Sequence, residues 1–334
     1  MKSLREGMIT GAVIFSLIFV WMVLRSNDTA QRLQDELPYD VAAILEPSKE
    51  VKKGPENSSQ DGLGKANAVQ PLPPAPIEGL FEMFEGKQLP ISRIQDDMTP
   101  FQAYKRPFQP VAGRPIVSIV IVDYGVSELM SKSILDNMPP EISLVLSSYA
   151  DEPSKWATAA RTYGHEFWLG LPLQTKDFGV DDIGPRALLQ NASAEENQRR
   201  LFNVLGTSVG YAGIVTQKDH IFDASSSGIE PALKQIFGRG LAMAESNTDT
   251  AALGLSMAME FGYPYAQNNF WLDKDLRPSV VERTLREVEA QAMRKGKAIA
   301  FVHPYPAALN KVQEWLATAP ENGIQIAPLS AMVQ

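Results

Sequence analysis

From residue 116 to the C-terminus, short apolar runs alternate with amphipathic segments, and this rhythm restricts the possible fold more than any other feature. The runs have the length and composition of strands that are buried on both faces. Helix signals separate them: Ser193 and Glu196 form a capping-box pattern, and Pro278 and Gly296 are placed to begin and end a helix. We expect strands at 116–122, 142–146, 166–171, 213–216, 241–244, 298–302 and 324–327, and a short strand near 270–272.

Buried strands that alternate with helices are typical of a parallel sheet covered by helices. We therefore predict an α/β fold, an irregular (β/α) barrel of about seven parallel strands, with an open doubly wound sheet as the alternative. The compact domain is expected at 77–334. Its first part, 77–115, is expected to be an arm on the barrel, because residues 77–110 are too apolar for a free linker.

The N-terminal region predicts a membrane anchor. Residues 7–24 are 18 uncharged residues, and as a helix they span about 27 Å, close to the hydrocarbon thickness of a bilayer. The run ends in bulky side chains and Arg25 rather than at a cleavage site with small residues. We therefore expect residues 1–25 to form an uncleaved transmembrane helix.

A linker follows the expected anchor. Residues 26–76 are polar and then rich in proline, a composition typical of a disordered, partly stiff tether. Positive charges favour a cytoplasmic N-terminus by a small margin. We expect a single-pass inner-membrane anchor that holds the main domain in the periplasm.

Two sparse residue types limit the chemistry. The chain has no Cys, which excludes a thiolate zinc site, an iron–sulfur cluster and a cysteine nucleophile. It has three His, so an imidazole metal centre has at most three ligands. The net charge of −8 argues against a nucleic-acid partner, which requires a basic face.

Candidate site residues follow the expected strands, because sites in parallel α/β folds lie at the carboxyl ends of strands. Asp123, Asp273 and His303 are in such positions, although Asp123 is also suited to cap the next helix. His303 lies between a strand and two prolines, which makes it the strongest single candidate. His220 is expected in a polar loop, and His165 precedes its strand and is expected to be structural.

Several short motifs in order carry a family resemblance. The stretch from about Glu78 to the C-terminus resembles the divergent polysaccharide deacetylases of bacterial envelopes. The similar segments are Leu89–Ile91, Tyr104–Phe108, Ile119–Gly125, Gly164–Glu166, Leu171–Pro172, Gly184–Leu189, Glu195–Asn197, Phe270–Asp273 and His303–Pro306.

The resemblance implies a (β/α) barrel, a divalent metal that is usually zinc, and removal of acetyl groups from N-acetylated sugars. The chain departs from the family pattern at the site itself. Val122 replaces one of the family's two paired Asp residues. The residues that stand where the family has His are Gly170, Gln217 and Tyr305, and Gln174 replaces an acidic residue.

Two hypotheses follow from these departures. The first is a catalytically degenerate barrel that binds an envelope glycan or serves as a scaffold at the membrane, with a peptidoglycan-related protein as a further possible partner. The second is an active metal-dependent de-N-acetylase with a rearranged site. The expected catalytic residues are Asp123, Asp273 and His303, the expected substrate-binding residues are Tyr124, Gln217 and Tyr305, and the metal ligands, if zinc is bound, are Asp123, His220 and His303.

Overall fold

The computed structural model describes residues 70–176, 184–222, 228–247 and 252–333. The expected anchor at 7–24 and most of the expected linker lie outside these ranges. Within them, no helix is both long enough and apolar enough to cross a membrane.

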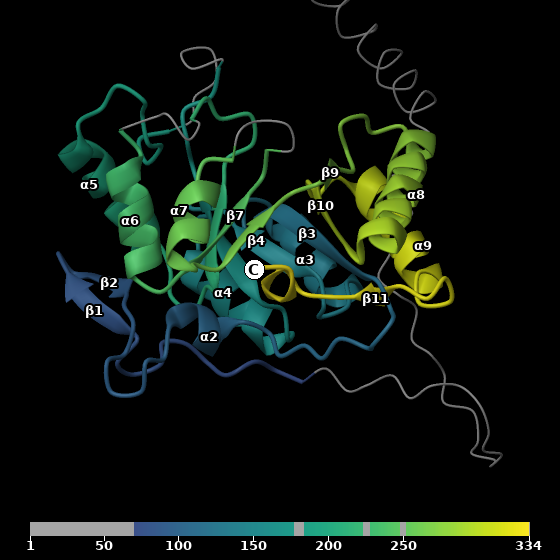
Figure 1. Ribbon diagram of the computed structural model, residues 1–334, viewed down its shortest axis with the longest axis horizontal. Helices are drawn as coiled ribbons and strands as arrows, with labels where there is room; N and C mark the ends of the chain where they lie inside the picture. Colours follow the sequence, from purple (N-terminus) through teal and green to yellow (C-terminus); the bar gives the residue numbers. More distant parts are fainter. Residues whose placement is uncertain (1–69, 177–183, 223–227, 248–251, 334) are drawn as a thin grey trace, which may run out of the picture. The chain divides into compact units, whose positions relative to one another are not determined.

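A parallel sheet forms the centre of the domain (Figure 1). Each expected strand is present to within two residues at its ends, and Tyr265–Gln267 adds a strand that was not expected. Along the sheet the order is β8-β7-β6-β5-β4-β3-β10-β9, and β11 pairs with the start of β3. The strands are β3 (Ile116–Tyr124), β4 (Ser143–Leu146), β5 (Phe167–Leu171), β6 (Gly213–Thr216), β7 (Ala242–Glu245), β8 (Tyr265–Gln267), β9 (Phe270–Trp271), β10 (Lys297–Val302) and β11 (Gln325–Ile326).

The two ends of this path are one stretch of chain. Residues 265–267 pair with β7, and residues 270–271 pair with β10, all in parallel. Between them, the Asn268 amide donates to the Glu245 carbonyl and the Asn269 amide donates to the Ile299 carbonyl. The parallel sheet therefore returns on itself and fits the expected (β/α) barrel, with β8 and β9 as a split seventh strand.

Helices cover the outside of the sheet, and α8 and α9 pack side by side (Figure 1). Pro278 begins α8, and Gly296 ends it with φ 79°, a left-handed conformation that glycine adopts without strain. Ser193 caps α5 by accepting from the Glu196 amide. The helices are α3 (Glu128–Asn137), α4 (Pro153–Thr162), α5 (Ala194–Leu205), α6 (Glu230–Gly238), α7 (Leu255–Phe261), α8 (Pro278–Lys295) and α9 (Pro306–Thr318).

Alternating residues of the strands belong to two hydrophobic cores, one on each face of the sheet. Ile119 and Ile121 of β3 belong to the larger core, which lies between the sheet and the helices. Val120 and Val122 belong to the smaller core, together with the buried ring of Trp168. This second core fills the inside of the barrel, so the barrel is packed rather than hollow.

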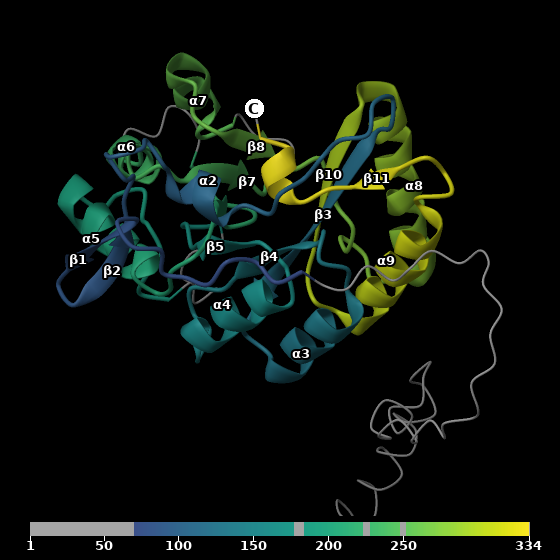
Figure 2. The ribbon, with the colours of Figure 1, turned by 90° about the horizontal axis from the view of Figure 1, so that it is seen from below.

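The N-terminal arm and the C-terminus both pack on the inner core. The arm contains a hairpin of β1 (Phe81–Phe84) and β2 (Lys87–Pro90), followed by α2 (Pro100–Tyr104). Apolar side chains of the arm and of the C-terminal 3-10 turn η2 (Leu329–Ala331) join that core, and Figure 2 shows η2 beside α2.

Packing of the arm begins earlier in the chain than the expected boundary at 77. The Leu72 amide donates to the Arg161 carbonyl, and Arg161 Nε donates to the Pro73 carbonyl at 2.6 Å. An extended proline-rich segment has no internal hydrogen bonds, so its carbonyls are free to accept from the buried arginine.

Candidate functional site

A cavity of about 340 Å³ opens at the carboxyl ends of the strands, where parallel α/β folds place their sites. It is bordered by the ends of β3, β4, β5 and β6 and by residues from β9 and from the segment after β10. Its lining includes Asp123, Gly170, Gln217, Lys218, Trp271 and His303.

Asp123 reaches this cavity because β3 is irregular at its end. The pairing of β3 with β4 shifts register between Ile121 and Tyr124, and Asp123 has φ 55°. Aspartate tolerates this left-handed conformation better than most residues do. The shift breaks the alternation of the strand: Val122 points into the barrel, whereas Tyr124 belongs to the core under the helices.

The cavity changes the acidity of Asp123. Its side chain is exposed to water inside the hollow, yet the surrounding protein desolvates the charge, and this raises the pKa of the carboxyl. Smaller effects oppose one another, since His303 lowers this pKa and Asp273 raises it. Asp123 and His303 both line the cavity, and Asp273 contacts His303.

Asp273 holds His303 in a fixed orientation. Its Oδ2 accepts from the backbone amide of His303 at 2.8 Å and lies 2.7 Å from His303 Nδ1. The Asp273 side chain is fully buried, whereas the imidazole is 23% exposed. An ionised carboxylate selects the tautomer with a proton on Nδ1, so Nε2 is left as the nitrogen available to a ligand.

Trp271 supports the imidazole and a nearby cation. Its indole ring stacks on His303 with centroids 4.8 Å apart and an interplanar angle of 22°. The Lys218 ammonium lies 4.6 Å from the centroid of the same indole, a distance typical of a cation–π interaction. Trp271 Nε1 donates to the Ser246 carbonyl, which fixes the ring.

The other predicted binding residues are distributed differently. Gln217 lines the cavity. Tyr305 is 46% exposed and lies beside His303, with ring centroids 5.7 Å apart. Tyr124 is fully buried and donates its hydroxyl to the Trp156 carbonyl. The prediction that Tyr124 contacts substrate is wrong, because the register shift turns its ring into the core.

His220 is also placed differently from the expected polar loop. Its side chain is buried and is not part of the cavity lining. Burial lowers the pKa of its imidazole to about 4. His165 is fully buried, as expected of a structural residue, and its Nδ1 lies 2.8 Å from the Ile142 carbonyl.

The donor set does not fit the zinc site that the family implies. Catalytic zinc needs three protein ligands and an open position. Among the described residues that line the cavity, Asp123 supplies the one carboxylate and His303 the one imidazole, whereas His220 lies outside the lining. Lys218 brings a positive charge to the same cavity. Across the described ranges, no group of three or more Asp, Glu and His side chains is arranged to hold a metal ion.

Sequence reasoning missed Ser147, Ser148 and Tyr149, which also line the cavity. Their available signal was their position directly after the expected strand 142–146.

Several known proteins are similar to this chain. A solved structure of an uncharacterized protein from Agrobacterium tumefaciens is 27% identical, with a TM-score of 0.70 over 74% of this chain and 100% of that one. Protein YibQ of Escherichia coli, also uncharacterized, is 21% identical over 204 residues, which are 61% of this chain and 63% of that protein. A CE4-family pseudoenzyme from Bacillus anthracis is 12% identical over 71% of this chain and 70% of that one, with a TM-score of 0.39. The model of the divergent polysaccharide deacetylase family matches residues 119–333, well over half of the chain, and the chain therefore belongs to that family.

Proposed function

We propose that this protein is a membrane-anchored envelope protein whose barrel binds a cell-envelope glycan without hydrolysing it. The observation that carries the proposal is the composition of the cavity. Gly170 and Gln217 line it in the places of two family imidazoles, and Lys218 supplies a cation, while Asp273, Trp271 and His303 remain tightly organised. Such a site keeps groups that recognise a sugar and lacks the ligands for a metal.

The two aromatic residues beside His303 differ in how much surface they offer to a sugar ring. Trp271 is almost fully buried, and its contacts with His303 and Lys218 leave it little free surface for a sugar ring. Tyr305 is exposed beside His303 and is therefore the residue that we expect to stack on a sugar. Asp123, Gln217 and Lys218 supply hydrogen-bonding groups for an N-acetylated sugar in the cavity.

Binding of an N-acetylglucosamine tetrasaccharide to the full chain in non-ionic detergent tests the proposal. We expect calorimetry to detect binding, and Asp123→Asn to weaken it about tenfold, the loss of one charged hydrogen bond. Asp97→Asn is the matched control, because Asp97 has φ 53° and lies on the exposed arm. Absence of binding in the wild-type protein, or equal losses in the two variants, contradicts the proposal.

One observation favours the alternative, an active de-N-acetylase with a rearranged site. The Asp273–His303 pair has the geometry of a positioned general acid or base. The same preparation is therefore assayed for bound zinc and for acetate released from the tetrasaccharide. Acetate release that is lost in His303→Gln would replace the binding proposal with the enzymatic one.

The location is part of the proposal and is supported by the sequence of residues 7–24. We infer that this run anchors the protein in the inner membrane and that the domain lies in the periplasm. Protease added to spheroplasts should digest the domain. Without protease, the intact chain should remain in the membrane fraction after a salt wash. Protection from the protease, or release of the intact chain by a salt wash, contradicts this placement.

A further inference from the structure

A second hollow, of about 550 Å³, lies beside α5 and carries a concentration of positive charge. Its lining includes four cationic side chains, Lys87, Arg186, Arg199 and Arg200, and the carboxylate of Asp151. We call this site the basic hollow. This arrangement is unexpected in a chain with a net charge of −8. The hollow includes part of the Gly184–Leu189 segment, to which the proposed function assigns no role.

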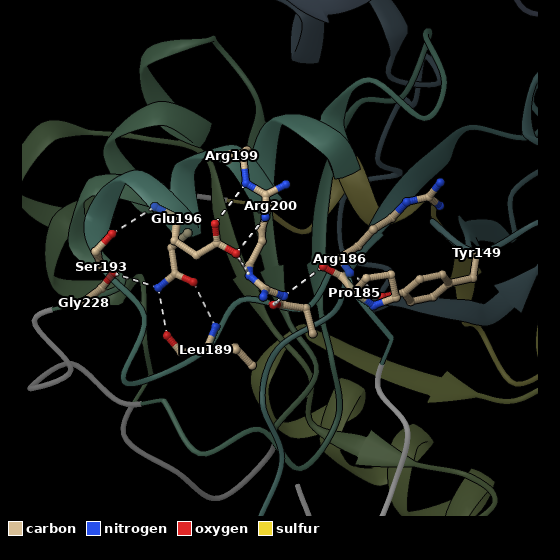
Figure 3. Close-up of polar contacts among 11 residues, drawn as sticks. Tyr149, Pro185, Arg186, Leu189, Ser193, Glu196, Arg199, Arg200 and Gly228 are labelled. Atoms are coloured by element: carbon tan, nitrogen blue, oxygen red, sulfur yellow. Dashed lines mark hydrogen bonds and ion pairs between the residues drawn. The ribbon is translucent and has the colours of Figure 1, made fainter. Parts of the chain in front are cut away.

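One carboxylate serves two of these arginines. Glu196 Oε1 accepts from Arg199 Nη2 at 2.8 Å and from Arg200 Nε at 2.7 Å, as Figure 3 shows. Arg200 Nη1 also donates to the Pro185 and Ala187 carbonyls, which fixes the loop against α5. The Glu196 side chain is thus directed to the arginines and does not complete the capping box that the sequence predicts.

The other two cations have neutral partners. Arg186 Nη1 donates to the Ser148 carbonyl, and its guanidinium lies 5.4 Å from the centroid of the Tyr149 ring. Lys87 Nζ donates to Asn203 Oδ1. Neither side chain forms an ion pair with any residue that the structure describes. Among the described residues, these four cations are set against three carboxylates, because Glu85 acts on Arg199 in addition to Asp151 and Glu196, and the hollow retains positive charge.

We propose that the basic hollow binds a compact anionic group, a phosphate or a carboxylate, carried by the glycan whose sugar occupies the cavity. Guanidinium groups held by protein hydrogen bonds are suited to such oxygens. Arg186 joins the two sites, because Ser148 and Tyr149, its partners, line the cavity. The assignment of the anion to a glycan rests on the proposed function, and the anion site itself is tested separately.

Calorimetry on the full chain in non-ionic detergent, at about 50 mM salt to limit screening, provides the test. The probes are pyrophosphate and tricarballylate, which distinguish a phosphate site from a carboxylate site. We expect at least one probe to bind, and Arg186→Gln and Arg199→Gln each to weaken its binding about fivefold or more. Arg277→Gln is the matched control: Arg277 is 75% exposed, is also paired with a carboxylate and does not line the hollow.

Arg199→Gln keeps the test informative if Arg186→Gln unfolds the loop, because the Arg199 side chain is 61% exposed. Binding of neither probe overturns the anion site, as does a change of less than about twofold in both variants. Binding of a probe without binding of the neutral tetrasaccharide contradicts the proposed glycan function and leaves the anion site standing. Binding of the tetrasaccharide without binding of either probe overturns the anion site and leaves the proposed glycan function standing.

Discussion

At the scale of single residues, His165 and His220 make the stability of the fold sensitive to acid. Both rings are buried, and desolvation lowers the pKa of each from 6.5 to about 4. The unfolded chain therefore takes up these protons first as the pH falls. Stability from each neutral ring is complete above about pH 6.5 and is lost progressively towards pH 4.

We expect each of these histidines to reduce the free energy of unfolding by roughly 3 kcal/mol between pH 7 and pH 4, since one pKa unit corresponds to about 1.4 kcal/mol. Urea unfolding at several pH values measures this slope. His165→Asn should lower stability at pH 7 but flatten the slope, because an Asn amide can occupy the place of Nδ1 without titrating. Carboxylates titrate alike in both proteins, so an unchanged slope would contradict the prediction.

Some residues of the candidate site could be predicted from the sequence and others could not. Asp123, Asp273 and His303 were identified because each follows an apolar run, and strand ends are readable from hydropathy. Tyr124 was expected at the cavity because it lies just after the expected strand end, but the structure continues β3 to Tyr124 and buries its ring. The register shift after Ile121 depends on the pairing with β4, a contact between segments distant in sequence.

At the scale of elements, β5 and β6 contain a matched pair of glycines with opposite roles. A Cβ on Gly213 of β6 would overlap the Ala242 carbonyl oxygen and the Trp168 ring. A Cβ on Gly170 of β5 would lie 3.5 Å from the Leu146 carbonyl oxygen, an ordinary contact, at the wall of the cavity. Only the first glycine is required for packing.

Gly213→Ala should therefore lower the free energy of unfolding by about 2–3 kcal/mol through overpacking, and Gly170→Ala should change it by less than about 0.5 kcal/mol. Chemical denaturation of both variants measures the difference. Gly170→Ala should also reduce tetrasaccharide binding, because it fills part of the cavity. Equal destabilisation by the two variants would contradict the different packing roles of the two glycines.

The ends of helix α8 could be predicted from local sequence signals. Pro278 and Gly296 act within a few residues of chain, and α8 begins and ends where they stand. The Glu196 side chain illustrates the limit of such local rules. Its backbone amide meets Ser193 as the pattern predicts, while its carboxylate binds Arg199 and Arg200, which compete for it from the next turn.

At the scale of the whole molecule, one buried carboxylate connects the arm, the barrel and the C-terminus. Glu166 Oε1 accepts from Ser143 Oγ, Trp168 Nε1 and the Ser330 amide at 2.9–3.0 Å. Its Oε2 accepts from the Arg106 amide at 2.9 Å and from the Ser330 hydroxyl. These partners are up to 164 residues away in the sequence, so the sequence alone identifies Glu166 as no more than the start of a strand.

Glu166→Gln tests whether this carboxylate holds the three parts together. The Gln amide nitrogen cannot accept a hydrogen bond, so even in the better orientation the Arg106 amide loses its acceptor, at about 1–3 kcal/mol, although the Ser330 hydroxyl can turn to accept from the new NH2 group. The remaining hydrogen bonds become weaker because they lose the charge of the carboxylate. We expect a loss of about 3 kcal/mol in the free energy of unfolding, together with faster hydrogen exchange at Arg106 and Ser330. Glu141→Gln is the control, because Glu141 pairs with the Arg106 side chain and is 35% exposed; its loss should stay below about 1 kcal/mol. Exchange that accelerates at neither position would mean that apolar contacts alone hold the arm and the C-terminus on the barrel.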